Sequence, residues 1–146
     1  MKITMSYDDS TINWMELCDL YKIAPLGIKI LDDLKLSFSN SRFKCFIFDS
    51  GNLVGVGRAL ADGKDCSYIC DIAVHPEYQG IGLGKKIVQN LIEQSHGHKK
   101  IILYANSGKE GFYYKLGFKI MKTAMAIFQN EDDAIKQGII SEIPPK

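Results

Sequence analysis

The sequence has no apolar run that approaches the ~20 residues needed to cross a membrane as a helix. Its opening residues, Met-Lys-Ile-Thr-Met-Ser-Tyr-Asp-Asp, also lack the long apolar core of a secretion signal. From these two absences we expect a cytoplasmic protein that does not bind membranes.

An excess of one charge sign is also missing. The chain has 18 basic and 17 acidic residues, which gives a formal net charge of +1. Such a balance provides no overall positive field for nucleic acid or for an anionic membrane surface. We therefore expect small-molecule partners and no nucleic acid.

Paired cysteines and metal-ligand clusters are not evident either. Cys66 and Cys70 fall in one predicted strand, about 13 Å apart at ~3.3 Å per residue, too far for a disulfide or for one shared metal. We expect these two, Cys18 and Cys45 to be reduced thiols. His96 and His98 stand in a loop without a nearby cysteine or acidic residue, so no metal is predicted.

The length and composition are those of one ordinary globular domain. A chain of 146 residues with 46% hydrophobic and 24% charged residues can bury a single core. We therefore expect one domain over residues 1–146. The sequence leaves open whether residues 130–146 are an extension that forms a last helix, a homodimer element or a disordered tail.

Hydrophobic periodicity predicts a mixed sheet with helices. Strands are expected at residues 2–7, 43–49, 53–61, 67–74 and 100–105, with a further strand pair around 119–129. Helices are expected at residues 11–21, 28–38 and 82–94, with a short one after Asn106. Hairpins before a single strand-helix-strand unit favour an α/β (α+β) mixed sheet that is mostly antiparallel with one parallel pair.

The most informative stretch is residues 71–86, where an apolar strand runs through a glycine-rich turn into an amphipathic helix. Gly80, Gly82 and Gly84 remove side chains from the turn, so its backbone N–H groups can converge at the start of the helix. Lys85 and Lys86 add positive charge. This arrangement predicts a ligand with a pyrophosphate.

Two familiar phosphate-binding motifs fit poorly. In a Walker loop the lysine is followed by Ser or Thr, but here Lys86 occupies that place. A dinucleotide fingerprint has the spacing Gly-x-Gly-x-x-Gly near the start of its fold, whereas these glycines are spaced Gly-x-Gly-x-Gly after three earlier strands.

The turn resembles the acetyl-coenzyme A signature of the GCN5-related N-acetyltransferases (GNAT). Gln79-Gly-Ile-Gly-Leu-Gly84 matches it at Gln79, Gly82 and Gly84. A second segment, Phe112-Tyr-Tyr-Lys-Leu-Gly-Phe118, resembles the Phe-Tyr-x-Lys-x-Gly-Phe segment of the same family, and Asn106 precedes Tyr113 by seven residues, as the family's Asn does. The likeness covers roughly residues 3–128, and Lys109 departs from it where members commonly carry Ala.

The resemblance implies a GNAT fold, with helices on both faces of the sheet, and acetyl-coenzyme A as cosubstrate without a metal. It implies cofactor contacts from Ile72, Ala73, Val74, Gln79, Gly80, Ile81, Gly82, Leu83, Gly84, Lys85, Asn106 and Tyr113. The Val74 N–H would bind the thioester oxygen, and Tyr113 would protonate the departing thiolate. Since neighbouring helical residues point about 100° apart, Tyr114 is expected to be a packing residue.

Asp71 interrupts an apolar strand and has two interpretations. It could be the catalytic base, because acidic residues on this strand act as bases, often through water, in several family members. It could instead form a structural ion pair with Arg58 on the neighbouring strand. His75, which precedes Pro76, is better explained as a turn residue.

Three functions follow from these resemblances. The first is direct acetyl transfer, within a ternary complex, to a primary amine of a small molecule, either an arylalkylamine or a polyamine-like compound. Ala24-Pro-Leu-Gly27 and Gly57-Arg58-Ala59 resemble small acetyltransferases grouped with plant serotonin N-acetyltransferase, which favours an arylalkylamine. The alternatives are a non-catalytic acyl-coenzyme A sensor and a protein lysine acetyltransferase; intact Tyr113 and Asp71 favour the enzyme.

Overall fold

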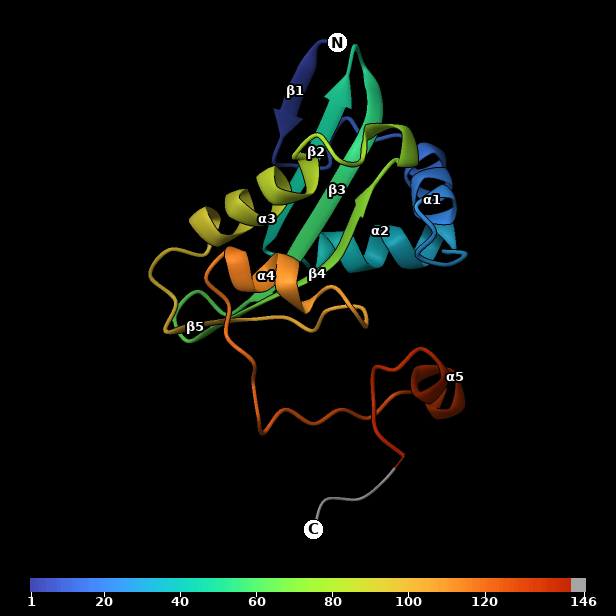
Figure 1. The fold of residues 1–146 in the computed structure, drawn as a ribbon. Coiled ribbons are helices and arrows are strands. Elements are labelled where there is room, and N and C mark those ends of the chain that lie inside the picture. The colour runs from blue at the N-terminus through green and yellow to red at the C-terminus, as the bar shows by residue number, and fades with distance from the viewer. Residues whose placement is uncertain (143–146) are drawn as a thin grey trace. The chain divides into compact units, whose positions relative to one another are not determined.

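The computed structural model describes residues 1–142 (Figure 1), which divide into two compact units, Met1–Leu103 and a second that begins at Tyr104. The first unit contains one five-stranded sheet in the order β1-β2-β3-β4-β5. Its strands are β1 (Ile3–Ser6), β2 (Phe43–Asp49), β3 (Asn52–Ala61), β4 (Cys66–Val74) and β5 (Lys100–Ile102). The first four are antiparallel and β5 is parallel to β4, which confirms the predicted mixed sheet.

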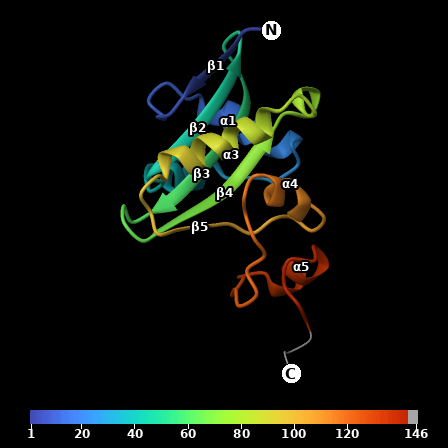
Figure 2. The ribbon, with the colours of Figure 1, turned by 60° about the vertical axis from the view of Figure 1, so that its left-hand side comes forward.

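Three helices pack on this sheet. The helices α1 (Trp14–Ile23) and α2 (Leu31–Ser39) cover one face, and α3 (Leu83–Gln94) lies across the other, as Figure 2 shows. The helix α1 begins three residues later than predicted, because the Asn13 side chain caps it by accepting hydrogen bonds from the N–H groups of Met15 and Glu16. No helix among residues 1–142 has the length and hydropathy of a membrane span.

An aromatic cluster forms the core between the sheet and the α1 and α2 helices. Phe38 stacks on Phe46 with ring centroids 5.6 Å apart, and Trp14 contacts Phe38 edge-on at 6.1 Å. Phe38, Phe46 and Tyr21 are fully buried. Each buried side chain of this kind contributes roughly 1.5–3 kcal/mol of transfer free energy, so this face holds both helices firmly on the sheet.

The opposite face is shaped by two glycines of β3. A Cβ atom at Gly57 would lie 2.6 Å from Ile72 Cδ1 and 2.7 Å from Ile87 Cγ2. A Cβ atom at Gly55 would lie 3.0 Å from Ile87 Cδ1. The missing side chains therefore let α3 approach the sheet closely, and this contact fixes the helix whose first turn follows the glycine-rich segment.

The second unit differs from the sequence prediction. It contains α4 (Glu110–Lys115) and α5 (Glu131–Lys136), and among its described residues no strand forms. The predicted strand pair around residues 119–129 is therefore wrong: this segment is irregular, and Ile120, Met125 and Ile127 are exposed. An apolar segment forms a strand only where a neighbour completes the backbone hydrogen bonds and covers the apolar face.

For residues 130–146 the sequence left open a last helix, a homodimer element or a disordered tail, and the structure contains a helix there. Asn130 caps α5 by accepting a hydrogen bond from the Asp133 N–H, and Ala134 is buried. The segment Pro144-Pro-Lys146 lies outside the described residues.

The glycine contact under α3 leads to a stability prediction. Gly57→Ala should lower the free energy of unfolding by about 1–3 kcal/mol, since the new methyl group overlaps Ile72 and Ile87. The thermal midpoint should fall by several degrees. Gly111→Ala is the control, because a methyl group at Gly111 would meet no atom within 4 Å beyond its own helix and chain neighbours. Equal midpoints for the two variants would contradict the packing argument.

Candidate functional site

A β-bulge in β4 is the central irregularity of the first unit. Val56 pairs with Ala73 and Arg58 pairs with Cys70, so Asp71 and Ile72 together stand opposite the single residue Gly57. The φ angle of Asp71 is +56°, a left-handed conformation that is unusual for a residue other than glycine. The extra residue changes the course of the strand just before its last residues, which were predicted to bind the cofactor.

The end of β4 has an open backbone edge. β5 pairs only with residues 66–68, and β4 continues beyond it to Val74. The His75 N–H donates to the Val54 carbonyl at 2.8 Å, so the alternation of an antiparallel ladder turns the Val74 N–H and C=O away from β3. By the same alternation, the Ala73 backbone faces β3. An extended ligand with amide groups can therefore hydrogen-bond at Val74.

The glycine turn that follows can accept an anion. Gly80 and Gly82 have φ angles of +81° and +90°, and beyond the chain neighbours no atom of the described residues lies within 4 Å of the place that a Cβ atom would take at either residue. Gly82 is the N-cap of α3 and provides no side-chain cap for the N–H groups of the first turn. These N–H groups and the positive end of the helix dipole suit a phosphate.

The other predicted residues of the turn contribute in different ways. Leu83 is buried, so its side chain anchors the start of α3 and only its backbone can reach a ligand. Ile81 and Lys85 are exposed, and the Gln79 side-chain amide donates to the Val74 carbonyl at 3.0 Å. The turn and the open edge of β4 are thus joined by a hydrogen bond.

Contacts outside the motif hold the turn in place. It begins with a short 3₁₀ helix, η1 (Pro76–Tyr78), whose Tyr78 hydroxyl donates to the Asp49 carboxylate at the end of β2. This hydrogen bond raises the pKa of Tyr78 and lowers the pKa of Asp49. The His75 Nδ1 atom accepts the Glu77 N–H at 3.1 Å, which matches the turn role expected for His75.

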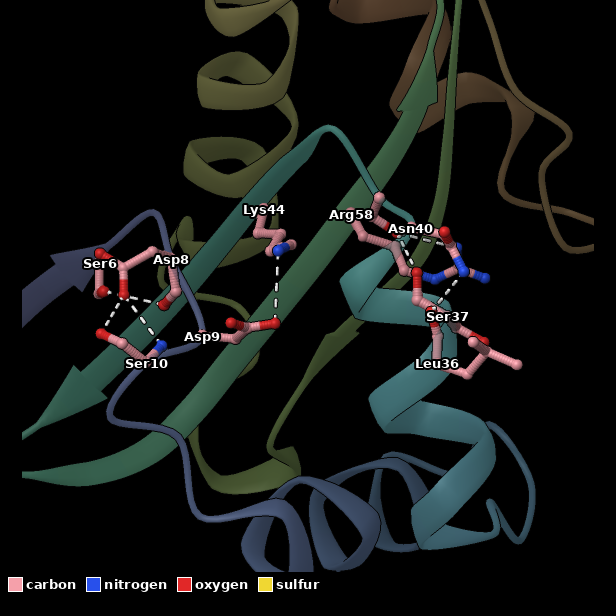
Figure 3. Close-up of polar contacts among 10 residues, drawn as sticks. Ser6, Asp8, Asp9, Ser10, Leu36, Ser37, Asn40, Lys44 and Arg58 are labelled. Atoms are coloured by element: carbon pink, nitrogen blue, oxygen red, sulfur yellow. Dashed lines mark hydrogen bonds and ion pairs between the residues drawn. The ribbon is translucent and has the colours of Figure 1, made fainter.

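The Asp71 carboxylate is paired with two cations. Its Oδ2 atom accepts a hydrogen bond of 2.8 Å from Arg58 Nε and lies 2.8 Å from Nη2 of the same guanidinium, and the Lys29 ammonium lies 3.8 Å from Oδ1. The Arg58 Nη1 atom also donates to Ser41 Oγ at 3.2 Å. Figure 3 shows Arg58 reaching from β3 to the end of α2, beside Ser37 and Asn40. The ion pair considered from the sequence is therefore present, and a role of Asp71 as base stays a prediction.

Neighbouring groups in the first unit offer little nucleophilic or metal chemistry. Burial raises the pKa of the Cys70 thiol to about 11, so this cysteine is protonated at neutral pH. Within residues 1–142, no three His, Cys, Asp or Glu side chains gather as a possible metal site.

Two predicted site residues, Asn106 and Tyr113, belong to the second unit. Tyr113 is half-buried, with ring centroids 5.0 Å from Phe112 and 6.0 Å from Phe118. Burial raises the pKa of Tyr113, so its phenol keeps a proton to donate at neutral pH. Tyr114 is exposed, with the Lys119 ammonium 4.6 Å from its ring centroid. Tyr114, which was expected to be a packing residue, is thus the exposed one of the two, and the role of Tyr113 as acid stays a prediction.

Lys109, which stands where family members commonly carry Ala, lies at the start of α4. Lys109 is the N-cap residue and makes no side-chain cap, while its N–H donates to the Asn106 carbonyl at 2.9 Å. The Glu110 carboxylate accepts the Gly108 N–H at 3.1 Å. The turn between Asn106 and α4 is therefore ordered by backbone and glutamate contacts.

Sequence reasoning missed the groups that support Asp71 from α1 and from the connection between α1 and α2. The Tyr21 hydroxyl donates to the Asp71 backbone carbonyl at 2.8 Å across 50 residues, and Lys29 approaches the carboxylate. Neither residue belongs to a motif, and only the packing of the helices on the sheet brings them to β4.

Comparisons with known proteins agree with this geometry. The model of the acetyltransferase (GNAT) family matches residues 10–118. An uncharacterized N-acetyltransferase, ycf52, of Pyropia yezoensis is 32% identical over 116 residues, which are 75% of this chain and 67% of the relative. Serotonin N-acetyltransferase 2 of Oryza sativa subsp. japonica, a chloroplastic protein, is 37% identical over 71 residues, which are 47% of this chain and 36% of the relative.

A solved structure supports the fold. The crystal structure of a Staphylococcus aureus protein of unknown function, described as a probable acetyltransferase, has a TM-score of 0.77 and 24% identity, and the match covers 86% of this chain and 97% of that one. For four relatives named ycf52 or ycf52-like, the match covers 41% to 67% of their own lengths.

The open glycine turn leads to a binding prediction. Gly82→Val should raise the dissociation constant for acetyl-coenzyme A about tenfold or more, because the side chain would block approach of a phosphate to the turn. Calorimetry measures this. Gly97→Val is the matched control, since Gly97 also has positive φ (+94°) and open space but lies beyond the other end of α3. Equal affinities of the two variants would disprove the phosphate site.

Proposed function

The chain belongs to the GNAT acetyltransferase family, and from this premise we propose that it transfers an acetyl group from acetyl-coenzyme A to the primary amine of a small molecule. The observation that carries the proposal is the continuity of the open edge of β4 with the uncapped glycine turn of α3. Residues 1–146 would act as one acetyltransferase domain, with residues 130–146 as a C-terminal extension.

Binding of the cosubstrate would use both parts of this continuous site. The turn from Gln79 to Lys85 and the first N–H groups of α3 would hold the pyrophosphate. The Val74 backbone would pair with an amide of the pantetheine or donate its N–H to the thioester oxygen, where negative charge develops as the amine attacks. Asn106 would contact the pantetheine.

The transfer itself requires two proton movements. As the new C–N bond forms and the C–S bond breaks, Tyr113 would give its phenolic proton to the thiolate, for which its raised pKa keeps it in the protonated form. The amine would lose its proton through water. Arg58 holds Oδ2 of Asp71 at 2.8 Å, whereas the Lys29 ammonium is farther from Oδ1, at 3.8 Å, so Oδ1 would be the atom of that carboxylate better placed to receive the proton.

The surroundings of Asp71 favour one class of acceptor. Lys29 and Arg58 place two cations at this carboxylate, and a polyamine would be repelled by them. Ile28 and Ile30, on either side of Lys29, are exposed at 85% and 65% and offer apolar surface. An arylalkylamine, with one amine and an aromatic body, fits these features better. The rice relative named serotonin N-acetyltransferase supports the same class.

A protein lysine is the second candidate acceptor, because exposed apolar side chains such as Ile28 and Ile30 could also contact a polypeptide. A coenzyme A sensor without activity is the third possibility. We place the reaction in the cytoplasm and allow for a homodimer.

A substrate panel tests the proposal. Thiol release from acetyl-coenzyme A should be faster with arylalkylamines than with polyamines, because Lys29 and Arg58 oppose additional positive charge. Release with a lysine-rich peptide alone would move the assignment to proteins. Calorimetric binding of acetyl-coenzyme A without release from any amine would favour the sensor, and absence of binding would overturn the proposal.

A second prediction tests the proton donor. Tyr113→Phe should lower kcat about 10²-fold, the usual contribution of a general acid, while the acetyl-coenzyme A dissociation constant changes less than about threefold. Tyr114→Phe is the matched control in the same helix, and its kcat should equal that of the wild type, since Tyr114 is exposed and pairs with Lys119. Similar turnover of both variants would exclude the acid role of Tyr113.

A further inference from the structure

Tyr21 has a buried hydroxyl and lies outside the two family motifs of the sequence. Tyr21 is in the last turn of α1, its side chain is inaccessible to solvent, and its Oη atom donates to the Asp71 backbone carbonyl at 2.8 Å. Burial raises the pKa of Tyr21 well above its usual value, so the phenol keeps its proton and remains a donor. The Lys29 ammonium lies 5.4 Å from the centroid of the same ring.

The partner of this hydroxyl is an unusual backbone group. Among the described non-glycine residues, only Ser50 and Asp71 have positive φ, and Ser50 is in the turn between β2 and β3. Asp71 is therefore the one inside a strand, at the bulge opposite Gly57. Its left-handed conformation is costly and needs support from surrounding structure. The Tyr21 hydroxyl provides such support by donating a hydrogen bond to the Asp71 carbonyl.

The same hydrogen bond fixes the direction of the backbone beyond the bulge. The Asp71 carbonyl and the Ile72 N–H belong to one planar trans peptide and point in opposite directions. Holding the carbonyl toward α1 thus sets the plane of the whole peptide. From there the Ile72 side chain enters the space above Gly57 against α3, and Val74 presents its N–H at the open edge.

We propose that Tyr21 is a positioning residue for acetyl transfer: through the Asp71 carbonyl, its hydroxyl keeps the bulge in the conformation that aligns the Val74 N–H and the Asp71 carboxylate. This inference rests on the proposed function. Tyr21 itself does not touch the reacting atoms. Its removal should impair the chemical step more than the binding of acetyl-coenzyme A, because the glycine turn is held separately by Tyr78 and Asp49.

The test is Tyr21→Phe, which removes only the hydroxyl. We expect kcat to fall about tenfold or more, with the dissociation constant of acetyl-coenzyme A within about threefold of the wild type. The Ala73 amide, which the ladder directs toward β3, should exchange with solvent at least about tenfold faster by NMR, since the bulge is no longer held. Both measurements are made well below the thermal midpoint.

The control is Phe46→Leu, which weakens the aromatic core on the same face but leaves the Tyr21 hydroxyl and its hydrogen bond to Asp71 in place. It should lower the thermal midpoint but leave kcat and the exchange of the Ala73 amide near the values of the wild type. A purely structural role of Tyr21 would make the two variants alike. Replacement of Tyr21 by 4-aminophenylalanine retains a hydrogen-bond donor at the same place and should give a kcat near that of the wild type. If Tyr21→Phe fails to fold, this variant tests the proposal in its place.

The outcomes separate the two proposals. If the wild type acetylates an amine and Tyr21→Phe has the same kcat and the same Ala73 amide exchange, the positioning role is overturned and the proposed function stands. If the wild type releases no thiol from acetyl-coenzyme A with any amine, the proposed function is overturned, and the positioning role with it. Failure of 4-aminophenylalanine to restore kcat in a folded protein would also count against the hydroxyl.

Discussion

The bulge of β4 opposite Gly57 is the constraint on which the first unit depends. On one side of the sheet, the absence of a side chain at Gly57 leaves space that Ile72 of β4 and Ile87 of α3 both occupy. On the other side, Tyr21 binds the carbonyl of Asp71, and Arg58 binds its carboxylate. Because Asp71 has a left-handed conformation at this bulge, contacts from the helices on both faces of the sheet hold the same few backbone atoms in place.

This arrangement explains how a short segment can offer two kinds of binding group. Beyond the bulge, no strand of residues 1–142 pairs with β4 on the side of Val74, so the Val74 N–H is open to a ligand. Immediately afterwards, Gly80 and Gly82 expose the first N–H groups of α3. A cosubstrate with amides at one end and phosphates at the other matches this order of groups along the chain.

Much of this could be predicted from the sequence, and the failures have physical reasons. Residues 71–86 predicted the strand, turn and helix because glycines at a helix start have few alternative roles. The strand pair around residues 119–129 was wrong, since Ile120 and Ile127 are exposed and this segment finds no strand partner among the described residues. The pairing of Asp71 with Arg58 was one of two alternatives, which the sequence could not separate.

By itself, the sequence determined the order of the helices and strands of the first unit, the glycine turn and the two motifs that relate the chain to its family, because these depend on residues close together in the chain. Only the tertiary structure decided that Tyr21 and Lys29 approach Asp71, and that Val74 lies on an open edge. Such contacts join residues up to 50 positions apart, and packing between helix and sheet selects them without leaving a local pattern.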